Sequence, residues 1–576
     1  MKKSGAALAR FALEQLGVTH TFGIPGVHNT ELYDELNSSA SIQPVLVTHE
    51  CGAAFMADAV SRTSNSIGTL LIVPASGVTH AASGIGEAFL AGIPMLVICG
   101  GIHAASEYRY QLHEMDQHSL LAPITKGSFH IKSHGEVIPT LYAAYQLAMR
   151  GEPGPVFVEL PYNIGNFLGE VASMPKFAGL EPQPKFDLTL VKQAAELLVT
   201  AKQAGFFLGW GAVDCQADLI ELAELLNAPV ATTLQGLSAF PANHALHTGM
   251  GVGDYSVPAA QQAFKEVDTV LAIGTRFAEI PTGSFSMQLP ENLIHLDINP
   301  EVINANYPAK IALEGDARLI VPALLKAVKE LNPKTSSLPI AKTIAKAKED
   351  YLQEWLAHTQ DGRVNPAAFL QALRNAIPDN TLMVADDGNH TYLMAELLPI
   401  LGARRFISPT DFNAMGYCVP AVIGAKLANP QLPVVGIVGD GALLMTGMEM
   451  ITAVRNQLGV VIFVFNDGEL SQIAQAQALP YKRKTCTQLA PINIQALAAT
   501  VGAEYVALHQ VAAIETAIQE ALQLAAQNKP VYVDVRVDYS KPTRFTQGIV
   551  KATLKRFAPR DKFRVVSRAL IRKLTG

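Results

Sequence analysis

Residues 432–468 read LPVVGIVGDGALLMTGMEMITAVRNQLGVVIFVFNDG, and this stretch decides the fold. Its first apolar run, Val434–Val438, predicts a buried parallel strand, and a second run, Val460–Phe465, predicts the neighbouring strand. Between them, Leu444–Asn456 is apolar at helical spacing, so the stretch predicts a strand, a helix and a strand. Each predicted strand ends in an acidic turn with glycine beside it. In open parallel sheets, ligands bind at that edge.

Two carboxylates at the ends of these strands predict a metal site. Asp440 and Asp467 lie 27 residues apart on strands that we expect to be adjacent, so their side chains can converge. The two charges repel unless a cation lies between them, and Mg²⁺ accepts a few hard oxygen ligands together with phosphate oxygens and water. Glycine lets the backbone approach a diphosphate, and the N-terminus of the next helix favours its negative charge. Either turn alone is typical of an ordinary strand–helix connection, but both at this spacing favour a metal-bridged diphosphate site.

Strands and helices alternate along most of the chain, which predicts an α/β protein with three doubly wound parallel-sheet domains. A proline-rich segment, Met174–Asp187, reads as a linker, and Pro333–Arg363 reads as a charged, partly helical connector. The expected units are residues 1–173, 188–330 and 364–540, followed by a basic tail, 541–576.

Composition excludes several classes of protein. The formal charge of −6 argues against nucleic acid as a partner. Five cysteines without metal-ligand spacing fit reduced thiols, so we expect a cytoplasmic protein. The N-terminal segment has no signal-peptide core, and no run of eighteen apolar residues predicts a membrane span.

Several stretches resemble the thiamine-diphosphate (ThDP) enzymes, in the decarboxylase/carboligase branch that includes acetolactate synthase, benzaldehyde lyase and pyruvate oxidase. GDG followed about two dozen residues later by N-[ND] is that family's metal–diphosphate motif, and this chain has Gly439–Gly441 and Asn466-Asp467. FGIPG, HE-x-G-AA-x-x-A and GIPMLVI, which begin at Phe22, His49 and Gly92, resemble its pyrimidine-binding domain. The resemblance covers nearly the whole chain up to about residue 540. It implies that 1–173 bind the pyrimidine, that 188–330 form the central domain and that 364–540 bind the diphosphate and metal.

The resemblance also implies a set of metal and diphosphate residues. Asp440 and Asp467 would be side-chain metal ligands, and Glu469 would offer its main-chain carbonyl; Asn466 is the alternative ligand if the register shifts by one residue. The family usually has Asn where this chain has Asp467, which bears on charge balance more than on metal binding. Met415 fits the position that supports the bent form of the cofactor, although a core methionine is the ordinary alternative. The further cofactor-binding residues would be Gly388, Asn389, His390, Gly439, Gly441 and Ala442.

Glu50 is the first catalytic candidate. A lone Glu at a strand end is usually solvated or caps a helix. By the resemblance, Glu50 bonds N1′ of the aminopyrimidine and exchanges a proton there. His28 resembles a histidine of benzaldehyde-lyase-like members, and Gln111 resembles a glutamine of carboligases. Because this copy of the motif is one residue longer, His113 is the alternative to Gln111.

Two observations bear on the assignment of His28, Gln111 and His113 to the substrate pocket. His28 and His113 are equally consistent with loop histidines that contact only backbone. The family often reads SGPG-x-TN where this chain has Ala75-Ser76-Gly77-Val78-Thr79-His80, so the loop differs and His80 replaces a polar amide.

The implied activity is that of a ThDP- and Mg²⁺-dependent 2-oxoacid decarboxylase/carboligase, most like acetolactate synthase, acting on 2-oxoacid and aldehyde substrates. The alternatives are a 2-hydroxyketone lyase/carboligase of benzaldehyde-lyase type, and a non-catalytic regulatory subunit with the ThDP fold. In this family the cofactor lies between the first domain of one subunit and the third domain of another, which implies a homodimer or homotetramer.

Two features stay open on the sequence. Glycine-rich turns in the central domain, such as Gly209-Trp210-Gly211, are compatible with FAD, which some relatives bind, and equally with no ligand. In the tail, Asp561–Thr575 has apolar residues at helical spacing and basic residues opposite. It predicts a helix that either packs on its own subunit or makes a peripheral membrane contact.

Overall fold

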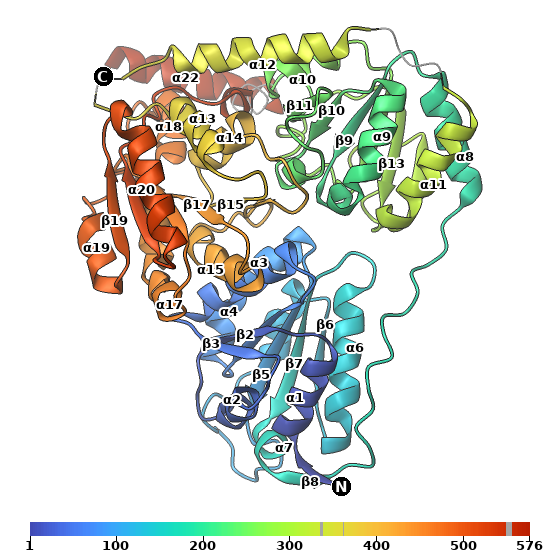
Figure 1. The fold of residues 1–576 in the computed structure, drawn as a ribbon, viewed down its shortest axis with the longest axis vertical. Helices are drawn as coiled ribbons and strands as arrows, with labels where there is room; N and C mark the ends of the chain where they lie inside the picture. Colours follow the sequence, from blue (N-terminus) through green and yellow to red (C-terminus); the bar gives the residue numbers. More distant parts are fainter. Residues whose placement is uncertain (334–337, 361, 549–555, 576) are drawn as a thin grey trace.

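The computed structural model describes residues 1–333, 338–360, 362–548 and 556–575 (Figure 1). Within these residues the chain forms three six-stranded sheets, in which every pair of neighbouring strands is parallel. Helices cover both faces of each sheet. The predicted α/β fold with three doubly wound parallel-sheet domains is therefore confirmed.

The first sheet lies at the bottom of Figure 1, with strand order β3-β2-β4-β5-β7-β6. Its central strands are buried along their whole length, as expected for a sheet covered by helices on both faces. The strands are β2 (His20–Gly23), β3 (Gln43–Leu46), β4 (Gly68–Ile72), β5 (Met95–Gly101), β6 (Gly127–His130) and β7 (Pro155–Pro161), with β1 (Lys2–Ser4) and β8 (Leu168–Glu170) as a separate antiparallel pair. The helices are α1 (Gly5–Gln15), α2 (Thr30–Asn37), α3 (Glu50–Thr63), α4 (Ser76–Ala91), α5 (Gln117–Leu121), α6 (Val137–Met149) and α7 (Tyr162–Asn166).

An extended connection leads from the first sheet to the second. Residues 173–187 form neither helix nor strand and run beside α6, where the Tyr142 hydroxyl donates to the carbonyl of Pro175 at 2.9 Å. Most of these residues are exposed. The proline-rich composition of the segment removes backbone donors and disfavours regular structure.

The second sheet has the order β11-β10-β9-β12-β13-β14 and lies at the upper right of Figure 1. Its strands are β9 (Ala204–Leu208), β10 (Val230–Thr232), β11 (His247–Met250), β12 (Thr269–Ile273), β13 (Asn292–Asp297) and β14 (Ile311–Glu314). The helices are α8 (Leu188–Thr200), α9 (Gln216–Leu226), α10 (Pro258–Ala263), α11 (Ala317–Glu330) and α12 (Ile340–Leu356), with 3-10 turns η3 (Trp210–Cys215) and η4 (Gln235–Ser238).

The third sheet has the order β16-β15-β17-β18-β20-β19. Its strands are β15 (Leu382–Ala385), β16 (Phe406–Ile407), β17 (Val434–Gly439), β18 (Val461–Phe465), β19 (Glu504–Leu508) and β20 (Val531–Val535). The helices are α13 (Pro366–Ala376), α14 (Asn389–Leu397), α15 (Cys418–Ala428), α16 (Asp440–Thr446), α17 (Met450–Arg455), α18 (Ser471–Tyr481), α19 (Ile494–Val501) and α20 (Ile514–Ala526).

The connection between β17 and β18 differs from the prediction. The two strands are adjacent and parallel as expected, but a continuous helix over Leu444–Asn456 is wrong. The chain forms α16, a 3-10 turn η5 (Gly447–Glu449) and then α17. The buried Tyr532 hydroxyl donates to the carbonyl of Gly447 at 2.7 Å, where the helix breaks. The break directs Glu449 toward the first domain, as described below.

The first and third domains share a core. Helix α3 packs along α15 (Figure 1), and their apolar residues belong to one buried cluster. Inside the contact, Asp58 accepts hydrogen bonds at 2.6 Å from both the Arg62 guanidinium and the Tyr417 hydroxyl. All three side chains are almost completely buried. Because a buried ion pair stays favourable only while every partner is in place, this contact fixes the two domains against each other.

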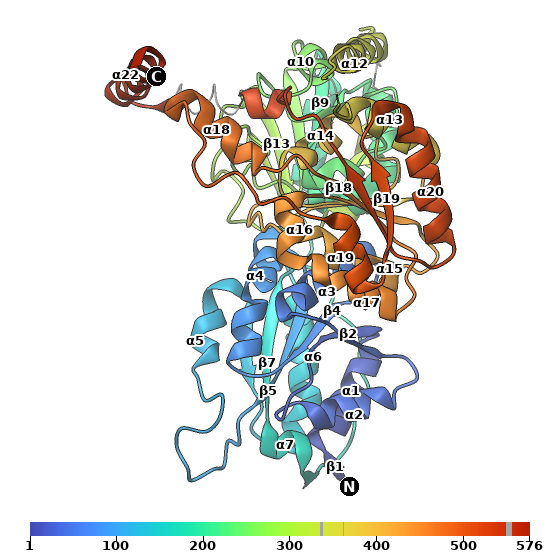
Figure 2. The same cartoon turned by 90° about the vertical axis from the view of Figure 1, so that its left-hand side faces the viewer.

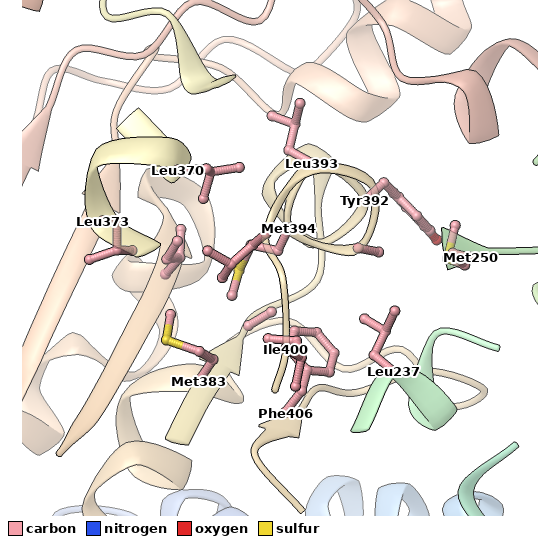
Figure 3. Close-up of a cluster of buried hydrophobic side chains, with 14 of the residues drawn as sticks. Leu237, Met250, Leu370, Leu373, Met383, Tyr392, Leu393, Met394, Ile400 and Phe406 are labelled. Carbon is pink, nitrogen blue, oxygen red and sulfur yellow. The ribbon is translucent and has the colours of Figure 1, made fainter. Parts of the chain in front are cut away.

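A second apolar contact joins the central and third domains (Figure 3). Leu237 and Met250 of the central domain belong to the same buried cluster as Tyr392, Ile400 and Phe406 of the third. Figure 3 shows the two sets facing each other. The third domain is therefore packed on both of the others.

The tail forms α22 (Pro559–Thr575), so the predicted helix is present and begins two residues earlier than expected. Figure 2 shows that it projects from the body of the molecule beside α18, with which it is in contact. Phe563 is 76% exposed and Ile571 58%. No helix among the described residues combines the length and apolar character that crossing a bilayer requires.

Candidate active site

The two acidic turns meet at the carboxyl edge of the third sheet. Asp440 begins α16 after β17, and Asp467 follows β18, where Gly439 and Phe465 are in register. Asp440 Oδ1 accepts from the main-chain amide of Gly441 at 2.8 Å, and its Oδ2 accepts from that of Gly468 at 2.7 Å. One carboxylate therefore holds both turns in place.

The electrostatics of this pair favour a bound cation. Burial raises the pKa of Asp467 to about 6, and the neighbouring carboxylates of Asp440 and Glu469 add to the shift, whereas a hydrogen bond from Ser471 opposes it. Burial also raises the pKa of Asp440. Two partly buried carboxylates that resist ionisation are stabilised in their charged form when a divalent ion binds between them.

The residues that flank Asp467 have other partners. The Asn466 side-chain amide donates to Asp534 Oδ1 at 3.0 Å, so Asn466 is already hydrogen-bonded within the protein. The Glu469 carboxylate forms an ion pair with Lys484 at 2.6 Å. The Glu469 side chain is thus held by a lysine, which leaves its main-chain carbonyl as the group that could face a metal.

A glycine turn after β15 forms a second wall of this edge. Gly388 has φ of 150°, a conformation that other residues rarely adopt, and a Cβ there would lie 2.8 Å from the His390 ring. Asn389 and His390 begin α14 and are buried, yet Asn389 Nδ2 and His390 Nε2 have no hydrogen-bond partner among the described residues. Burial lowers the pKa of His390 to about 3, so the ring is neutral. The unpaired, buried Asn389 amide at a helix N-terminus suits an anionic ligand such as a diphosphate.

Asp386 and Met415 connect this wall to the acidic turns. Asp386 accepts from the amide of Gly416 at 2.9 Å and from that of Cys418 at 2.7 Å, which holds the segment that carries Met415. The Met415 methyl lies 3.5 Å from where a Cβ on Gly441 would be. Met415 therefore lies over the GDG turn, and glycine at 441 leaves space beside it.

Glu50 lies at the first residue of α3, buried at the carboxyl edge of the first sheet. His49 caps the helix by accepting from the amide of Cys51 at 3.1 Å. The turn before it is fixed from the third domain, because Glu449 Oε1 accepts from the amide of Thr48 at 3.0 Å. Nδ1 of His80, on α4, lies 3.0 Å from Glu50 Oε2, and the ring of His80 stacks on that of His49 at 4.6 Å.

The predicted substrate-side residues separate into two groups. His28 follows β2 and His113 follows β5, and their rings lie 5.1 Å apart. Burial, with a smaller contribution from His113, lowers the pKa of His28. Nδ1 of each ring is buried without a hydrogen-bond partner in the part of the chain that the structure describes. Gln111 instead donates to the carbonyl of His103 at 3.3 Å. The structure therefore pairs His113, rather than Gln111, with His28.

These groups gather at two edges rather than at one point. Within the described part of a single chain, no hydrogen bond or ion pair joins Glu50 to Asp440 or Asp467. Glu50 lies at the edge of the first sheet and the two aspartates lie at the edge of the third, and among the described residues each edge presents polar atoms without a hydrogen-bond partner.

Sequence reasoning missed three residues of these edges. His80 was noted only as a departure, Glu449 was assigned to a continuous helix, and Tyr539 was not considered. The buried Tyr539 hydroxyl has no hydrogen-bond partner among the residues that the structure describes. Burial raises its pKa, and the nearby Asp467 and Asp440 add to the shift. Tyr539 follows β20, which pairs with β18. The signal that could have identified Tyr539 is the apolar run Val531–Val535, because a strand predicted there would end close to Tyr539 at this edge.

A cavity of about 320 Å³ lies between the first and central domains. The central-domain turns Gly211 and Gly274–Arg276 line it, together with Asp297 at the end of β13. Burial raises the pKa of Asp297 to about 6. Glycine turns at strand ends next to an acidic group are compatible with a nucleotide ligand.

Three family models match the chain, one for each sheet. All describe thiamine pyrophosphate enzymes: the N-terminal TPP binding domain matches residues 3–120, the central domain matches residues 191–324 and the C-terminal TPP binding domain matches residues 386–535.

Curated relatives match over almost the same extent. The acetolactate synthase isozyme 3 large subunit of Escherichia coli (strain K12) is 30% identical over 555 residues, which cover 93% of this chain and 95% of the relative. The acetolactate synthase large subunit of Haemophilus influenzae is 30% identical over 557 residues, 94% of this chain and 96% of the relative. A probable acetolactate synthase large subunit of Methanocaldococcus jannaschii is 31% identical over 494 residues, 83% of each chain.

Proposed function

This chain belongs to the thiamine pyrophosphate enzyme family, and from that premise we propose that it is a ThDP- and Mg²⁺-dependent 2-oxoacid decarboxylase/carboligase, most like acetolactate synthase. The observation that carries the proposal is the pair of carboxylates at adjacent strand ends, the buried Asp440 and the half-buried Asp467, with the pKa of Asp467 raised to about 6. We place Mg²⁺ between them, with Glu469 contributing its main-chain carbonyl.

The diphosphate would lie between the two walls of this edge. Gly388, Asn389 and His390 would form one wall, in which the Asn389 amide is a donor without a partner among the described residues. Gly439, Gly441 and Ala442 would supply the other wall, at the N-terminus of α16. Met415 would contact the cofactor from the side. Asn466 keeps a supporting role, because its amide holds Asp534.

Glu50 would hold and move a proton at N1′ of the aminopyrimidine. Burial of the carboxylate and its fixed position at the start of α3 suit this role. When bound, thiamine diphosphate supplies the electron sink for breaking and forming bonds beside a carbonyl carbon. The protein's own part is to orient the cofactor, exclude water and move protons.

His28 and His113 would orient the carbonyl groups of the substrates. Each ring has a buried nitrogen without a partner, and the two rings are in contact distance. Gln111 would act indirectly, by donating a hydrogen bond to the carbonyl of His103. The donor would be a pyruvate-like 2-oxoacid, and the acceptor a second 2-oxoacid or an aldehyde.

The domain roles follow the same proposal. Residues 1–173 would bind the pyrimidine, 188–330 would form the central domain and 364–540 would bind the diphosphate and metal. Because Glu50 and the acidic turns lie at separate edges, a complete site would combine the first domain of one subunit with the third of another, in a homodimer or homotetramer. The five cysteines form no disulfide, which suits a cytoplasmic location.

FAD is a further proposed ligand. The cavity of about 320 Å³ between the first and central domains, with its glycine turns, is where it would bind. The visible absorption spectrum of the purified protein tests this directly: a flavin spectrum supports the assignment, and its absence removes FAD.

One observation favours a second candidate activity. The His28–His113 pair would serve equally in a lyase/carboligase that cleaves and joins 2-hydroxyketones without decarboxylation. A non-catalytic regulatory subunit is the remaining alternative. The buried Glu50 argues against it.

Protein reconstituted with ThDP and Mg²⁺ and offered pyruvate separates the three. Release of CO₂ with formation of acetolactate supports the proposed activity. Cleavage of a 2-hydroxyketone without CO₂ release from pyruvate supports the lyase. If neither reaction occurs, the result supports the regulatory subunit.

A further inference from the structure

A group of two histidines and one glutamate lies at the β6 side of the first sheet, apart from the residues assigned above. His118 belongs to α5, His130 ends β6 and Glu159 lies in β7, in register with His130 across the parallel pair. One ligand atom from each residue, two imidazole nitrogens and a carboxylate oxygen, lies within 4.8 Å of the others. His118 Nε2 is 2.9 Å from Glu159 Oε2, and His130 Nδ1 is 3.9 Å from the same oxygen. Three side chains from three elements therefore converge on one point.

The surroundings hold this geometry. Gly101 lies beside the Glu159 carboxylate, where a Cβ would come within 2.5 Å of Oε1, so glycine leaves room for it. The other ring nitrogen of His118, Nδ1, is hydrogen-bonded to the Ser128 hydroxyl. A metal-binding histidine usually has such a partner on its second nitrogen, which fixes the orientation of the ring.

The Glu159 carboxylate is buried, and its neighbours hold it in place. Gln117, which precedes His118 on α5, contacts this carboxylate. Gln117 is itself buried and accepts from the amide of Ala75 at 3.1 Å. The group thus presents an oxygen ligand in a fixed position.

An ion pair between His118 and Glu159, whose Nε2 and Oε2 atoms lie 2.9 Å apart, is the simplest alternative, but it leaves the position of His130 unexplained. His118 Nε2 is buried and close to the carboxylate, yet it lacks the alignment of a hydrogen bond to any partner in the described protein. His130 is also directed at the same oxygen from the neighbouring strand, which an ion pair would not require.

We propose that His118, His130 and Glu159 bind a divalent transition-metal ion of the Zn²⁺ class. Two imidazoles and one carboxylate form a three-ligand set that Zn²⁺ accepts in tetrahedral coordination, with water in the fourth position. The site is separate from the Asp440–Asp467 pair, where only oxygen ligands are available and Mg²⁺ is preferred. It does not depend on the proposed activity.

A test has to separate this site from another group of similar composition. His49, Glu50 and His80 also bring their ligand atoms within 4.8 Å of one another, but there Glu50 is assigned to the cofactor. The experiment therefore uses protein saturated with ThDP and Mg²⁺, which occupies both the acidic turns and Glu50.

Co²⁺ is the probe, because four-coordinate Co²⁺ with imidazole ligands absorbs strongly in the visible region. Chelator-treated protein, reloaded with ThDP and Mg²⁺, is titrated with Co²⁺, and Zn²⁺ is then added in competition. We expect one strongly absorbing Co²⁺ per chain, which Zn²⁺ displaces. The variants Glu159→Gln and His130→Asn should weaken Co²⁺ binding by about tenfold or more, since loss even of a partner outside the coordination sphere costs that much.

Two matched variants serve as controls. His134→Ala removes a half-buried histidine of the same domain that is hydrogen-bonded to the carbonyl of Phe167, and His80→Asn removes the histidine beside Glu50. Both should keep the absorption and the affinity, and circular dichroism with gel filtration confirms that each variant is folded. Unchanged Co²⁺ absorption in folded Glu159→Gln, loss of the signal in His80→Asn, or failure of the unmodified protein to bind would each overturn the proposal.

Discussion

Nδ1 of His80 lies 3.0 Å from Oε2 of Glu50, so the carboxylate at the start of α3 has an imidazole as its hydrogen-bond partner. The two residues come from successive strand–helix units of one sheet, and the ring of His49 stacks on His80 from the other side. An amide in the place of His80 could orient Glu50, but an imidazole can also exchange a proton with it. His80 is therefore a positioning residue that can also exchange a proton with Glu50.

Replacement of His80 by asparagine should lower kcat by about tenfold and leave KM for the 2-oxoacid within a factor of two or three. A hydrogen bond to a charged group contributes about 1.5–3 kcal/mol. A change of about 1.4 kcal/mol in the activation free energy alters the rate tenfold. His49→Gln, which keeps a helix cap but loses the ring stack, is the matched control and should change kcat less. Steady-state kinetics over a range of pH measures both; identical profiles for His80→Asn and the unmodified enzyme would contradict the role.

Glu50→Gln should retain ThDP binding and lose most turnover. The amide fills the same space at the start of α3 but cannot exchange a proton, and proton transfer by a positioned side chain contributes about 10²–10⁴-fold. Calorimetric titration with ThDP measures the binding, and the rate of CO₂ release from pyruvate measures turnover. Full activity in this variant would remove Glu50 from the mechanism.

Asp440 and Asp467, which we propose as metal ligands, should respond differently to replacement by asparagine. Asp440→Asn removes the carboxylate that holds both turns, so the Kd for Mg²⁺ in the presence of ThDP should rise at least about tenfold. Asp467→Asn restores the amide that the family motif usually has and removes one of two repelling charges, so its Kd should change only a few-fold. Equal losses in the two variants would be inconsistent with this assignment.

The same pair predicts a pH dependence. The pKa of Asp467 is about 6 in the metal-free protein, and a protonated carboxyl does not bind Mg²⁺. Affinity should therefore weaken as the pH falls through 6 in the unmodified protein and remain flatter in Asp467→Asn. Calorimetry at pH 5.5 and pH 7.5 on both proteins measures the difference, and parallel slopes would contradict it.

Glu87 should make stability depend on pH. It is completely buried beside Arg62, which is 3.7 Å away, and burial raises its pKa from 4.5 to about 7. A folded state that holds a proton more tightly than the unfolded state is stabilised at low pH, and that stabilisation is lost as the pH rises from about 4.5 to about 7. The linkage corresponds to at most about 3 kcal/mol.

Glu87→Gln removes this titration. Between pH 5 and pH 8, the melting temperature of the variant should fall less than that of the unmodified protein, measured by calorimetry in the same buffers. Asp379→Asn, at an exposed carboxylate that pairs with Arg374 on the surface, is the control and should follow the unmodified protein. A variant that tracks the unmodified protein at every pH would contradict the account.

Deletion of α22 tests the proposed peripheral membrane contact. The helix touches α18 but leaves Phe563 and Ile571 largely exposed among basic residues. Such a face binds anionic lipid through both apolar and electrostatic contacts. The full chain should therefore float with phosphatidylserine vesicles at low salt, and a chain ending at residue 558 should not. Equal flotation of the two would assign α22 to packing on its own subunit alone.

The strands could be predicted because their apolar runs are short, continuous and bounded by turns. The predicted strands Val434–Val438 and Val460–Phe465 match β17 and β18 to within one residue. The break at Gly447 was not predictable, since its cause is the hydroxyl of Tyr532, 85 residues away along the chain. The insertion of β20 between β18 and β19, which brings Tyr539 to the metal edge, depends in the same way on pairing that local periodicity does not contain.

The candidate site shows the same division. Residue types and spacing at Asp440 and Asp467 predicted adjacent strands with converging carboxylates. The choice between Gln111 and His113 depended on the path of an exposed loop, in which Tyr110 and His113 both have positive φ. Side-chain partners such as Glu449 with Thr48 join residues 401 positions apart, and no local pattern indicates them.

The contact between α3 and α15 bears on how the polypeptide tolerates a break. The exposed segment 173–187 is an accessible target for a protease, whereas Asp58, Arg62 and Tyr417 lock its two flanks together through a dry interface elsewhere. A nick there should leave both fragments bound to each other through gel filtration and separable only by denaturant. The packed α3–α15 interface, rather than the continuous backbone, would then hold the two parts of the enzyme together.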